Sequence, residues 1–361
     1  MYGGDKYLSV QEETVARGTL VTDAPSFLPI ESESLKAAFV EEVNTEFRGD
    51  VSIRTQKAIT RVAQSLGGNI SGNFYPEGGS NKDGIGLFLK YLMGSVDSLQ
   101  VGSSPTMLHN FKAVRDPWLA TELGDKGLSI HVNRPTVGST IEAFPFQGCR
   151  VSGFHLVQAP SANLKYTVDI FGQQALAKTT AIANPTYSTV GQFKSTHMYC
   201  WDGVTPVGTG PDYSGFSKGA ANDMSLRSFN LDITNGLTDQ VVLGSQADYP
   251  TETDIGMIQA TVSLTALAKD PASGWSSIDT FEKWIDDTDI ELFFKWDNGE
   301  AIAAAQNHCL YVHCPVIHIT DSNIEDVLEG ENMFTMTGQC LVSTDDVYNI
   351  GLFLQNSDPS I

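Results

Sequence analysis

The sequence predicts a mainly β protein built from two tandem domains of the β-sandwich or β-barrel type, each with one short flanking helix. Alternation of apolar and polar residues with a period of two dominates the chain, only two segments have helical spacing, and the order of predicted elements repeats. A length of 361 residues also suits two domains. We place the domains at residues 1–175 and 197–361, and we interpret residues 176–196, rich in Ala, Thr and Pro, as the linker.

The clearest strand signals are segments in which every second residue is apolar. GNISGNFY from Gly68 places Ile70 and Phe74 on one face, and SFNLDITNG does the same before an Asn-Gly turn signal. MIQATVSLTA alternates in the same way. Further strands are predicted to close the two halves: RVSGFHLV and NLKYTVDIFG in the first, and MFTMTGQCLV and VYNIGLFLQN in the second.

Two short helices are predicted, one in each half. The first begins after Asp83 and ends at Gly94, a residue suited to a helix C-terminus. The second starts near Ser276, which can cap the helix because Asp279 follows three residues later. Their apolar stripes are predicted to be Ile85, Phe88, Leu89 and Leu92 in the first helix, and Ile278, Phe281 and Ile285 in the second.

Five points of the first half recur in unchanged order in the second, at offsets of 196, 188, 193, 182 and 183 residues. Near-constant spacing in unchanged order is typical of a tandem duplication, although β-rich sequences also align with themselves easily. The matched points are Ser34-Leu35 with Asn230-Leu231, Ile70 with Ile258, Ile85 with Ile278, His131 with His313, and Val151 with Phe334.

Charge separates the two halves. Residues 1–180 hold 16 Lys and Arg against 18 Asp and Glu, whereas residues 181–361 hold 6 against 25, so that formal charges of −2 and −19 make up the total of −21. Two similar folds therefore carry different surfaces. The acidic total argues against direct DNA binding, which needs clustered Lys and Arg near phosphate.

Targeting and redox signals are weak. The N-terminus has no basic region followed by an apolar run, and no apolar stretch reaches the 18 residues of a membrane helix, so we expect function without membrane insertion. The odd number of cysteines and the lack of C-x-x-C spacing favour reduced thiols in the core. These cysteines are Cys149, Cys200, Cys309, Cys314 and Cys340.

No catalytic, cofactor or metal site is predicted. The sequence has no nucleophile elbow, Walker loop, dinucleotide fingerprint or H-E-x-x-H motif, and the acidic pairs Asp286-Asp287 and Glu325-Asp326 are expected to be solvated, which disfavours a hydrolase. The strongest metal candidate fails because strand alternation puts its members on opposite faces. This candidate consists of His308, Cys314 and His318 on one face, and Cys309 and His313 on the other.

A long basic loop is the strongest interaction candidate. The segment from Lys36 to Leu66 lies between two predicted strands and has no clear period. A long loop on a compact β-domain is expected to contact something, although a merely solvated loop is the alternative. We interpret Arg48-Gly49-Asp50 as a turn rather than an integrin motif. The predicted site residues for contacts between subunits or stacked rings are Arg48, Arg54, Lys57 and Arg61.

Over nearly its whole length the chain resembles the phage tail tube proteins of long-tailed phages, in their two-part family. Motif order and spacing carry this resemblance, since each motif alone is weak. The motifs are S-x-S-L (Ser32 to Leu35), G-x-h-x-G (Gly68 to Gly72), a helix ending in Gly (Leu87 to Gly94), G-C-R-V (Gly148 to Val151), D-G (Asp202-Gly203), a strand before N-G (Phe229 to Leu237) and L-G-S (Leu243 to Ser245). The departures are the inserted DPASGWSS, an acidic tail, and Ala260 in place of a strand Gly.

The resemblance implies a structural role in a virion tail assembled in the host cytoplasm, with no cofactor. Six domains would form a ring, from three chains holding two domains each or from six chains in a true hexamer. Rings would stack into a tube, join other tail proteins and let genomic DNA pass without specific binding. The alternative is a phage decoration protein or a receptor- or glycan-binding β-sandwich module, for which Tyr199-Trp201 and Trp275 are the only aromatic candidates.

Overall fold

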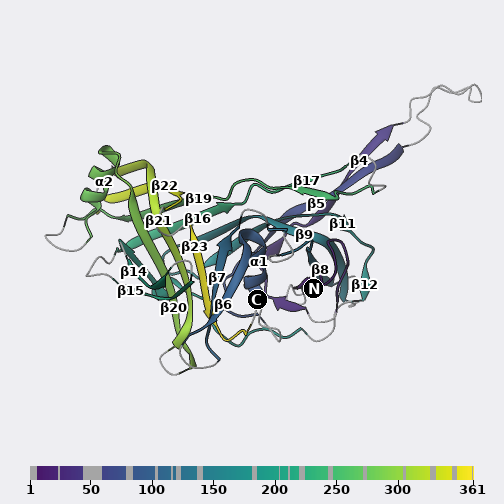
Figure 1. The fold of residues 1–361 in the computed structure, drawn as a ribbon, viewed down its shortest axis with the longest axis horizontal. Helices are drawn as coiled ribbons and strands as arrows, with labels where there is room; N and C mark the ends of the chain where they lie inside the picture. The colour runs from purple at the N-terminus through teal and green to yellow at the C-terminus, as the bar shows by residue number, and fades with distance from the viewer. Residues whose placement is uncertain are drawn as a thin grey trace, which may run out of the picture.

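The computed structural model describes most of the chain. The described residues are 6–22, 25–43, 59–78, 84–101, 105–114, 117–118, 123–135, 141–180, 185–202, 204–209, 212–218, 224–242, 247–270, 275–303, 306–325, 331–343, 348–359 and 361. The residues form antiparallel sheets with two α-helices, which confirms the predicted mainly β fold (Figure 1).

The first half of the chain contains twelve strands and one helix among its described residues. They are β1 (Tyr7–Glu12), β2 (Ser26–Leu28), β3 (Ser32–Glu33), β4 (Lys36–Val43), β5 (Ile59–Asn73), α1 (Gly84–Met93), β6 (Gly94–Gln100), β7 (Met107–Ala113), β8 (Leu128–Pro135), β9 (Ile141–Gln158), β10 (Lys165–Gly172), β11 (Gln174–Ala175) and β12 (Thr179–Thr180).

The second half contains eleven strands, one α-helix and a short 3-10 helix in the part that the structure describes. They are η2 (Ser195–His197), β13 (Met198–Asp202), β14 (Val204–Thr209), β15 (Asp212–Lys218), β16 (Leu226–Thr234), β17 (Thr238–Gln240), β18 (Glu252–Asp254), β19 (Gln259–Leu267), α2 (Ser277–Ile285), β20 (Ile290–Ala303), β21 (Gln306–Glu325), β22 (Met333–Leu341) and β23 (Gly351–Asn356).

Strand pairing within the first half follows one antiparallel path. β1 pairs with β8, β8 with β9, β9 with β10, β10 with β5, and β5 with β3 and β4. The short strands β11 and β12 pair with the beginning of β9. β9 is therefore central, since it contacts strands along both of its edges.

The second half pairs along a similar path. β13 pairs with β20, β20 with β21, β21 with β22, β22 with β19, and β19 with β16. The last strand, β23, pairs with the beginning of β21. The hairpin of β17 and β18 extends from the end of β16 and the start of β19.

Two pairings join the halves into one sheet. β16 lies against the end of β9, with Leu231 opposite Leu156 and Ile233 opposite Phe154. β23 inserts between β21 and β7, with Leu354 opposite His109. In Figure 1 the two halves form adjacent lobes, and the β4–β5 hairpin projects from the first lobe at the upper right.

The predicted strand alternation corresponds to burial. Ile70 and Phe74 of the GNISGNFY segment are fully buried, as are Phe229, Leu231 and Ile233 of β16. All five cysteines are free and buried, which confirms their interpretation as reduced core residues. Burial of alternate residues on facing strands removes apolar surface from water at about 25 cal/mol per Å², the main stabilising term.

Both predicted helices form, with one error in the predicted packing. Ser276 caps α2 by accepting a hydrogen bond from the Asp279 amide at 3.0 Å, and Gly94 ends α1 with a φ of +100°. The predicted stripe of α1 is buried, but Ile285 of α2 is 64% exposed and Trp284 packs against the core instead. No helix in the described part of the chain is long and apolar enough to cross a membrane.

Candidate assembly interfaces

The β4–β5 hairpin, residues 36–66, has two strongly exposed strands in its described part, residues 36–43 and 59–66. Its described part runs in register from Lys36 opposite Gly67 to Val43 opposite Ile59, with a bulge near Glu41. Four large apolar side chains on it are more than 40% exposed. A two-stranded ribbon that no other sheet covers usually carries polar side chains, so this group marks a contact surface. The four side chains are Phe39, Val40, Ile59 and Val62.

Of the four predicted site residues, Arg61 lies in the described part of this hairpin. Its guanidinium lies 4.1 Å from the centre of the Phe39 ring and 3.5 Å from Glu41, and both ionic side chains are largely exposed. Such an exposed pair contributes little stability, so Arg61 remains available for contacts. Arg48, Arg54 and Lys57 lie outside the described residues.

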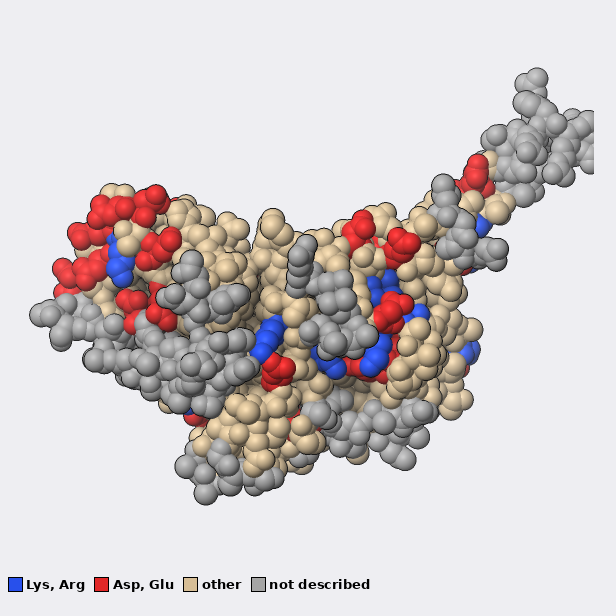
Figure 2. All heavy atoms as spheres, viewed as in Figure 1, with Lys and Arg blue, Asp and Glu red and all other residues tan. Residues whose placement is uncertain are grey.

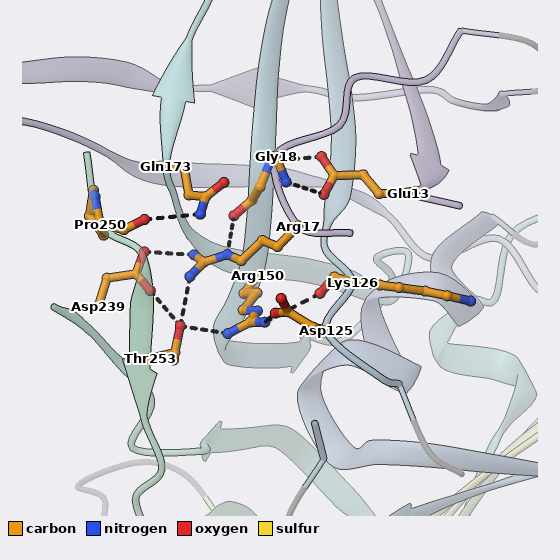
Figure 3. A network of polar contacts seen from close by, with 11 residues as sticks. Glu13, Arg17, Gly18, Asp125, Lys126, Arg150, Gln173, Asp239, Pro250 and Thr253 are labelled. Atoms are coloured by element: carbon orange, nitrogen blue, oxygen red, sulfur yellow. Dashed lines mark hydrogen bonds and ion pairs between the residues drawn. The ribbon is translucent and has the colours of Figure 1, made fainter. Parts of the chain in front are cut away.

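The β17–β18 hairpin, residues 238–254, is docked on the first half by a buried polar network (Figure 3). The two terminal nitrogens of Arg17 donate to Asp239 Oδ2 and Thr253 Oγ1, each at 2.7 Å, and its Nε donates to the Gly148 carbonyl at 3.0 Å. Thr253 Oγ1 donates to the other Asp239 oxygen at 2.7 Å. Arg17 is therefore bonded on three sides, and its side chain is 2% exposed.

Arg150 of β9 also contacts the same hairpin. Its Nη1 donates to Thr253 Oγ1 at 2.5 Å and its Nη2 contacts Asp125 at 3.2 Å, while its guanidinium stacks on Trp118. Burial, and next the neighbouring Arg17, lower the pKa of Arg150 to about 9, which keeps it protonated at neutral pH. A charge-assisted bond thus fixes Thr253.

Two more residues complete the docked hairpin's seat. Gln173 Nε2 donates to the Pro250 carbonyl at 2.9 Å. Glu13 accepts from the amides of Gly18 at 2.7 Å and Gly148 at 2.8 Å, although burial still raises its pKa above the ordinary value. These bonds hold the turn that carries Arg17 against β9.

Sequence reasoning missed this network. The tandem-domain interpretation assigned no role to Arg17, and Arg150 entered only as a letter of the G-C-R-V motif. A usable signal existed, because Arg150 stands in a strand between the apolar residues Cys149 and Val151 and so interrupts a buried run. An ionic residue in such a run is expected to have a buried partner.

Two of the strand edges that lie open within the described part of the chain belong to different halves. The edge of β3 and β4 opposite β5 has no strand partner there, and neither does the segment Asp321–Glu325 on the side opposite β22. Unpaired strand edges are templates for pairing with another chain. Leu35 on the first edge is nevertheless buried and Ile324 on the second is half-buried.

Acidic side chains gather around α2 in the second lobe. Figure 2 shows this group at the upper left, whereas most Lys and Arg side chains in the view lie toward the centre and right. His318 of β21 borders the group, with its Nδ1 3.2 Å from Asp289 and 3.7 Å from Asp287. Other carboxylates here belong to Asp279, Glu282 and Asp286.

The histidines and aromatic residues singled out in the sequence have ordinary surroundings. His313 bonds Glu291 at 2.8 Å and the Tyr348 hydroxyl at 2.7 Å, whereas His318 lies among the carboxylates near α2. The described residues contain no group of three side chains able to hold a metal. Trp201 and Trp275 are buried, and Tyr199 stacks on Trp201.

Comparison with known proteins identifies the family. Residues 3–308, more than half of the chain, match the family model described as "Phage tail tube protein". No curated protein matches the chain. Two solved structures are similar: the virion of a native gene transfer agent particle and the tail of an empty one, each at 14% identity and a TM-score of 0.26, covering 42% of this chain and 95% of theirs. The chain belongs to the phage tail tube protein family and is a structural subunit of the tube in a virion tail.

Proposed function

We propose that three copies of this chain close into a ring of six pseudo-equivalent domains, at residues 1–175 and 197–361, joined by the linker 176–196. Rings of this kind stack into the tail tube. The observation that carries the proposal is the β9–β16 junction, which joins the two halves of one chain. The corresponding strands, β21 and β3–β4, each have an edge without a strand partner among the described residues.

Matching connections between strands support the duplication. Six pairings of the first half have counterparts of the same order and direction in the second. They are β1–β8 with β13–β20, β8–β9 with β20–β21, β9–β10 with β21–β22, β5–β10 with β19–β22, β3 and β4 on β5 with β16 on β19, and β12 on β9 with β23 on β21.

The irregularities of these strands match as well. Ser152 is the extra residue of β9 opposite β10, and Thr320 is the extra residue of β21 opposite β22, an offset of 168. The register shift after Leu128 in β8 recurs after Ile290 in β20, an offset of 162. Bulges are specific features of a sheet, so their recurrence favours a common origin over chance similarity.

These registers also refine the sequence matches. Ser34-Leu35 correspond to Asn230-Leu231 at the predicted offset of 196, because the register of β3 on β5 is equivalent to that of β16 on β19. On the registers, Ile70 corresponds to Leu264 rather than Ile258. In the same way His131 corresponds to Phe293 and Val151 to Ile319.

The strand pairing that joins the two halves of one chain predicts the pairing that joins neighbouring chains. β16 pairs with the end of β9, and their counterparts are the β3–β4 edge and the end of β21, both open within the described residues. We infer that Ser34 of one chain lies opposite Glu325 of the next, and Leu35 opposite Ile324. Three junctions within chains and three between them close six domains into a ring.

The proposed role is mechanical rather than catalytic. A chain with a formal charge of −21 offers few phosphate partners, so genomic DNA would slide through the lumen without specific binding. The decoration-protein or glycan-binding alternative is disfavoured because two of its three aromatic candidates are buried.

The ring is tested by a disulfide between Ser34→Cys and Glu325→Cys, two exposed positions placed opposite each other by the proposed register. After mild oxidation of assembled tubes and denaturation, covalent species of two and three chains should appear. A ladder that ends at three chains supports a three-chain ring, whereas a ladder up to six chains supports the true hexamer.

Ser34→Cys with Thr320→Cys is the control. Thr320 lies five residues from Glu325 along β21, about 17 Å in a strand, beyond the reach of a disulfide. The control should give no ladder. Equal linking in both variants, or none in either within tubes of normal appearance, contradicts the proposed pairing.

A further inference from the structure

The two long hairpins of the chain are counterparts of each other. Val43 lies opposite Ile59 in the β4–β5 hairpin, and Asp239 lies opposite Thr253 in the β17–β18 hairpin. The offsets, 196 and 194, equal those that relate β3 to β16 and β5 to β19. One hairpin lies docked on the first half of its own chain, and the other projects away from the molecule (Figure 1).

The seat of the docked hairpin has an uncovered counterpart in the second half. Under the docked hairpin, Gln173 is 4% exposed and the side chain of Arg150 is 3% exposed. The offset of 168 that relates β9 to β21 and β10 to β22 gives as their counterparts Leu341, 39% exposed, and His318, whose side chain is 44% exposed. Val342, the counterpart of Gln174, is 66% exposed.

We propose that this uncovered seat, formed by His318, Leu341 and Val342, binds the β4–β5 hairpin of the adjacent chain in the same ring. The inference rests on the proposed ring and names the partner of a surface that the ring alone leaves undetermined. The partner is a second copy of this chain, and the apolar face of its projecting hairpin covers the two exposed apolar residues of the seat.

Several positions of the two proposed contact surfaces are apolar where their counterparts are polar. Asp239 and Thr253 of the docked hairpin correspond to Val43 and Ile59, and Gln173 corresponds to Leu341. Three polar positions of the clamp inside the chain are thus apolar on the two proposed surfaces, whereas Arg150 has the polar counterpart His318. A polar group on only one surface would lose its partner on docking, so the joint change indicates matched surfaces.

Charge is complementary in both cases but with reversed sign. The docked hairpin carries four carboxylates and no Lys or Arg, and it lies on Arg17 and Arg150. The projecting hairpin carries five Lys and Arg residues against four carboxylates, and three of the five lie between residues 54 and 61, where there is no acid. Its proposed seat is bordered by Asp287 and Asp289. Such complementarity steers the correct partner more than it adds affinity.

Contact between the hairpins supports docking within one ring. The Gln64 amide at the base of the projecting hairpin donates to the Asp248 carbonyl of the docked hairpin at 2.6 Å. The counterpart of Gln64 is Ile258, and next to it Met257 is 76% exposed. Each hairpin would therefore end at the base of the next one, so that the six hairpins form a continuous band around the ring.

Hydrogen exchange in rings closed by the Ser34→Cys and Glu325→Cys disulfide tests the inference. The probe is the pair of peptides 39–43 and 59–62, which lie beyond the proposed strand pairing. In isolated linked rings their exchange should be at least about tenfold slower than in the unassembled subunit. Adding Leu341→Asp and Val342→Asp should return exchange to the subunit rate while the rings still link.

Val15→Asp is the control, because Val15 is 77% exposed and lies away from the seat on the first half; it should leave the slow exchange unchanged. Linked rings whose hairpin peptides exchange quickly until rings stack would overturn docking within the ring and assign the hairpin to the successive ring. Failure of the linkage itself would instead contradict the proposed ring, so the two failures are distinguishable.

Discussion

Arg17 and Asp239 form a buried ion pair of 2.7 Å although 222 positions separate them in the chain. Their side chains are 2% and 10% exposed. Arg17 also donates to Thr253 and to the Gly148 carbonyl, and Asp239 accepts from Thr253, which offsets part of the cost of removing both charges from water. The pair fixes the β17–β18 hairpin on the first half.

Arg17→Met should lower the free energy of unfolding by about 3–5 kcal/mol, because it leaves the Asp239 carboxylate buried and unpaired. Chemical denaturation of the unassembled subunit measures this change. Arg17→Met combined with Asp239→Leu should recover much of the loss, since neither charge remains. Lys165→Met is the control, because Lys165 and Glu31 are exposed, and it should cost less than about 1 kcal/mol.

Gly68→Ala should destabilise the subunit by about 2–3 kcal/mol. Gly68 has a φ of +152°, and an added Cβ would lie 2.6 Å from the Ser34 carbonyl oxygen and 2.8 Å from Leu35 Cα, which are backbone atoms that cannot yield easily. The neighbouring Gly67→Ala is the matched control, because its Cβ would meet nothing nearer than 4.0 Å. Equal melting temperatures for both variants would contradict the predicted clash.

Acid should weaken the fold through His131. This residue of β8 is 1% exposed, its Nε2 has no hydrogen-bond partner in the described structure, and burial lowers its pKa from 6.5 to about 4. As pH falls below 6.5 the unfolded chain takes up the proton first, so stability is lost between pH 6.5 and 4. The loss from this group should reach about 3 kcal/mol.

His131→Leu should remove this part of the pH dependence, as measured by denaturation midpoints across that range. Some slope should remain, because burial also lowers the pKa of His109. His197→Leu serves as the control, since His197 is only half-buried at the end of η2, where burial and then Lys194 lower its pKa. An unchanged slope in His131→Leu would assign the acid sensitivity to other groups.

Local patterns predicted the strands well and the contacts between distant segments poorly. Alternation located β5, β16 and β19 because one face of each is buried and the other is not. The same rule gives no information on which strands pair. The insertion of β23 between β21 and β7 joins residues more than 240 positions apart, which no local period encodes.

The candidate site was predicted in part for the same reason. The segment from Lys36 to Leu66 was predicted as a basic loop without strand period, which is wrong for its described ends, because these form β4 and the beginning of β5. Its role as an interaction element stays a prediction. Its exposed apolar residues Phe39, Val40 and Ile59 could not be distinguished from core residues, because sequence alone does not show which face remains uncovered. The error at Ile285 has the same origin.

Reversing the charges of Arg54, Lys57 and Arg61 to Glu should slow tube assembly at least about tenfold in low salt. The change makes the projecting hairpin acidic, like its proposed seat beside Asp287 and Asp289, and at 0.01 M salt the repulsion acts over about 30 Å. Light scattering measures the rate. Raising salt to about 0.15 M shortens the range to about 8 Å and should restore part of it.

The matched control carries the same total change of charge elsewhere on the chain, as Lys165→Glu, Lys178→Glu and Lys194→Glu. Lys165 and Lys178 are exposed and pair with Glu31 and Glu142 rather than with the hairpin or its seat, so this variant should assemble faster than the hairpin variant at every salt concentration. Exposed ion pairs are each worth only about 0–1 kcal/mol, so the difference should appear in the rate more than in the final amount of tube. If both variants slow assembly equally, net charge alone controls the rate, and the excess of acid in the second half serves the lumen or the outer surface instead.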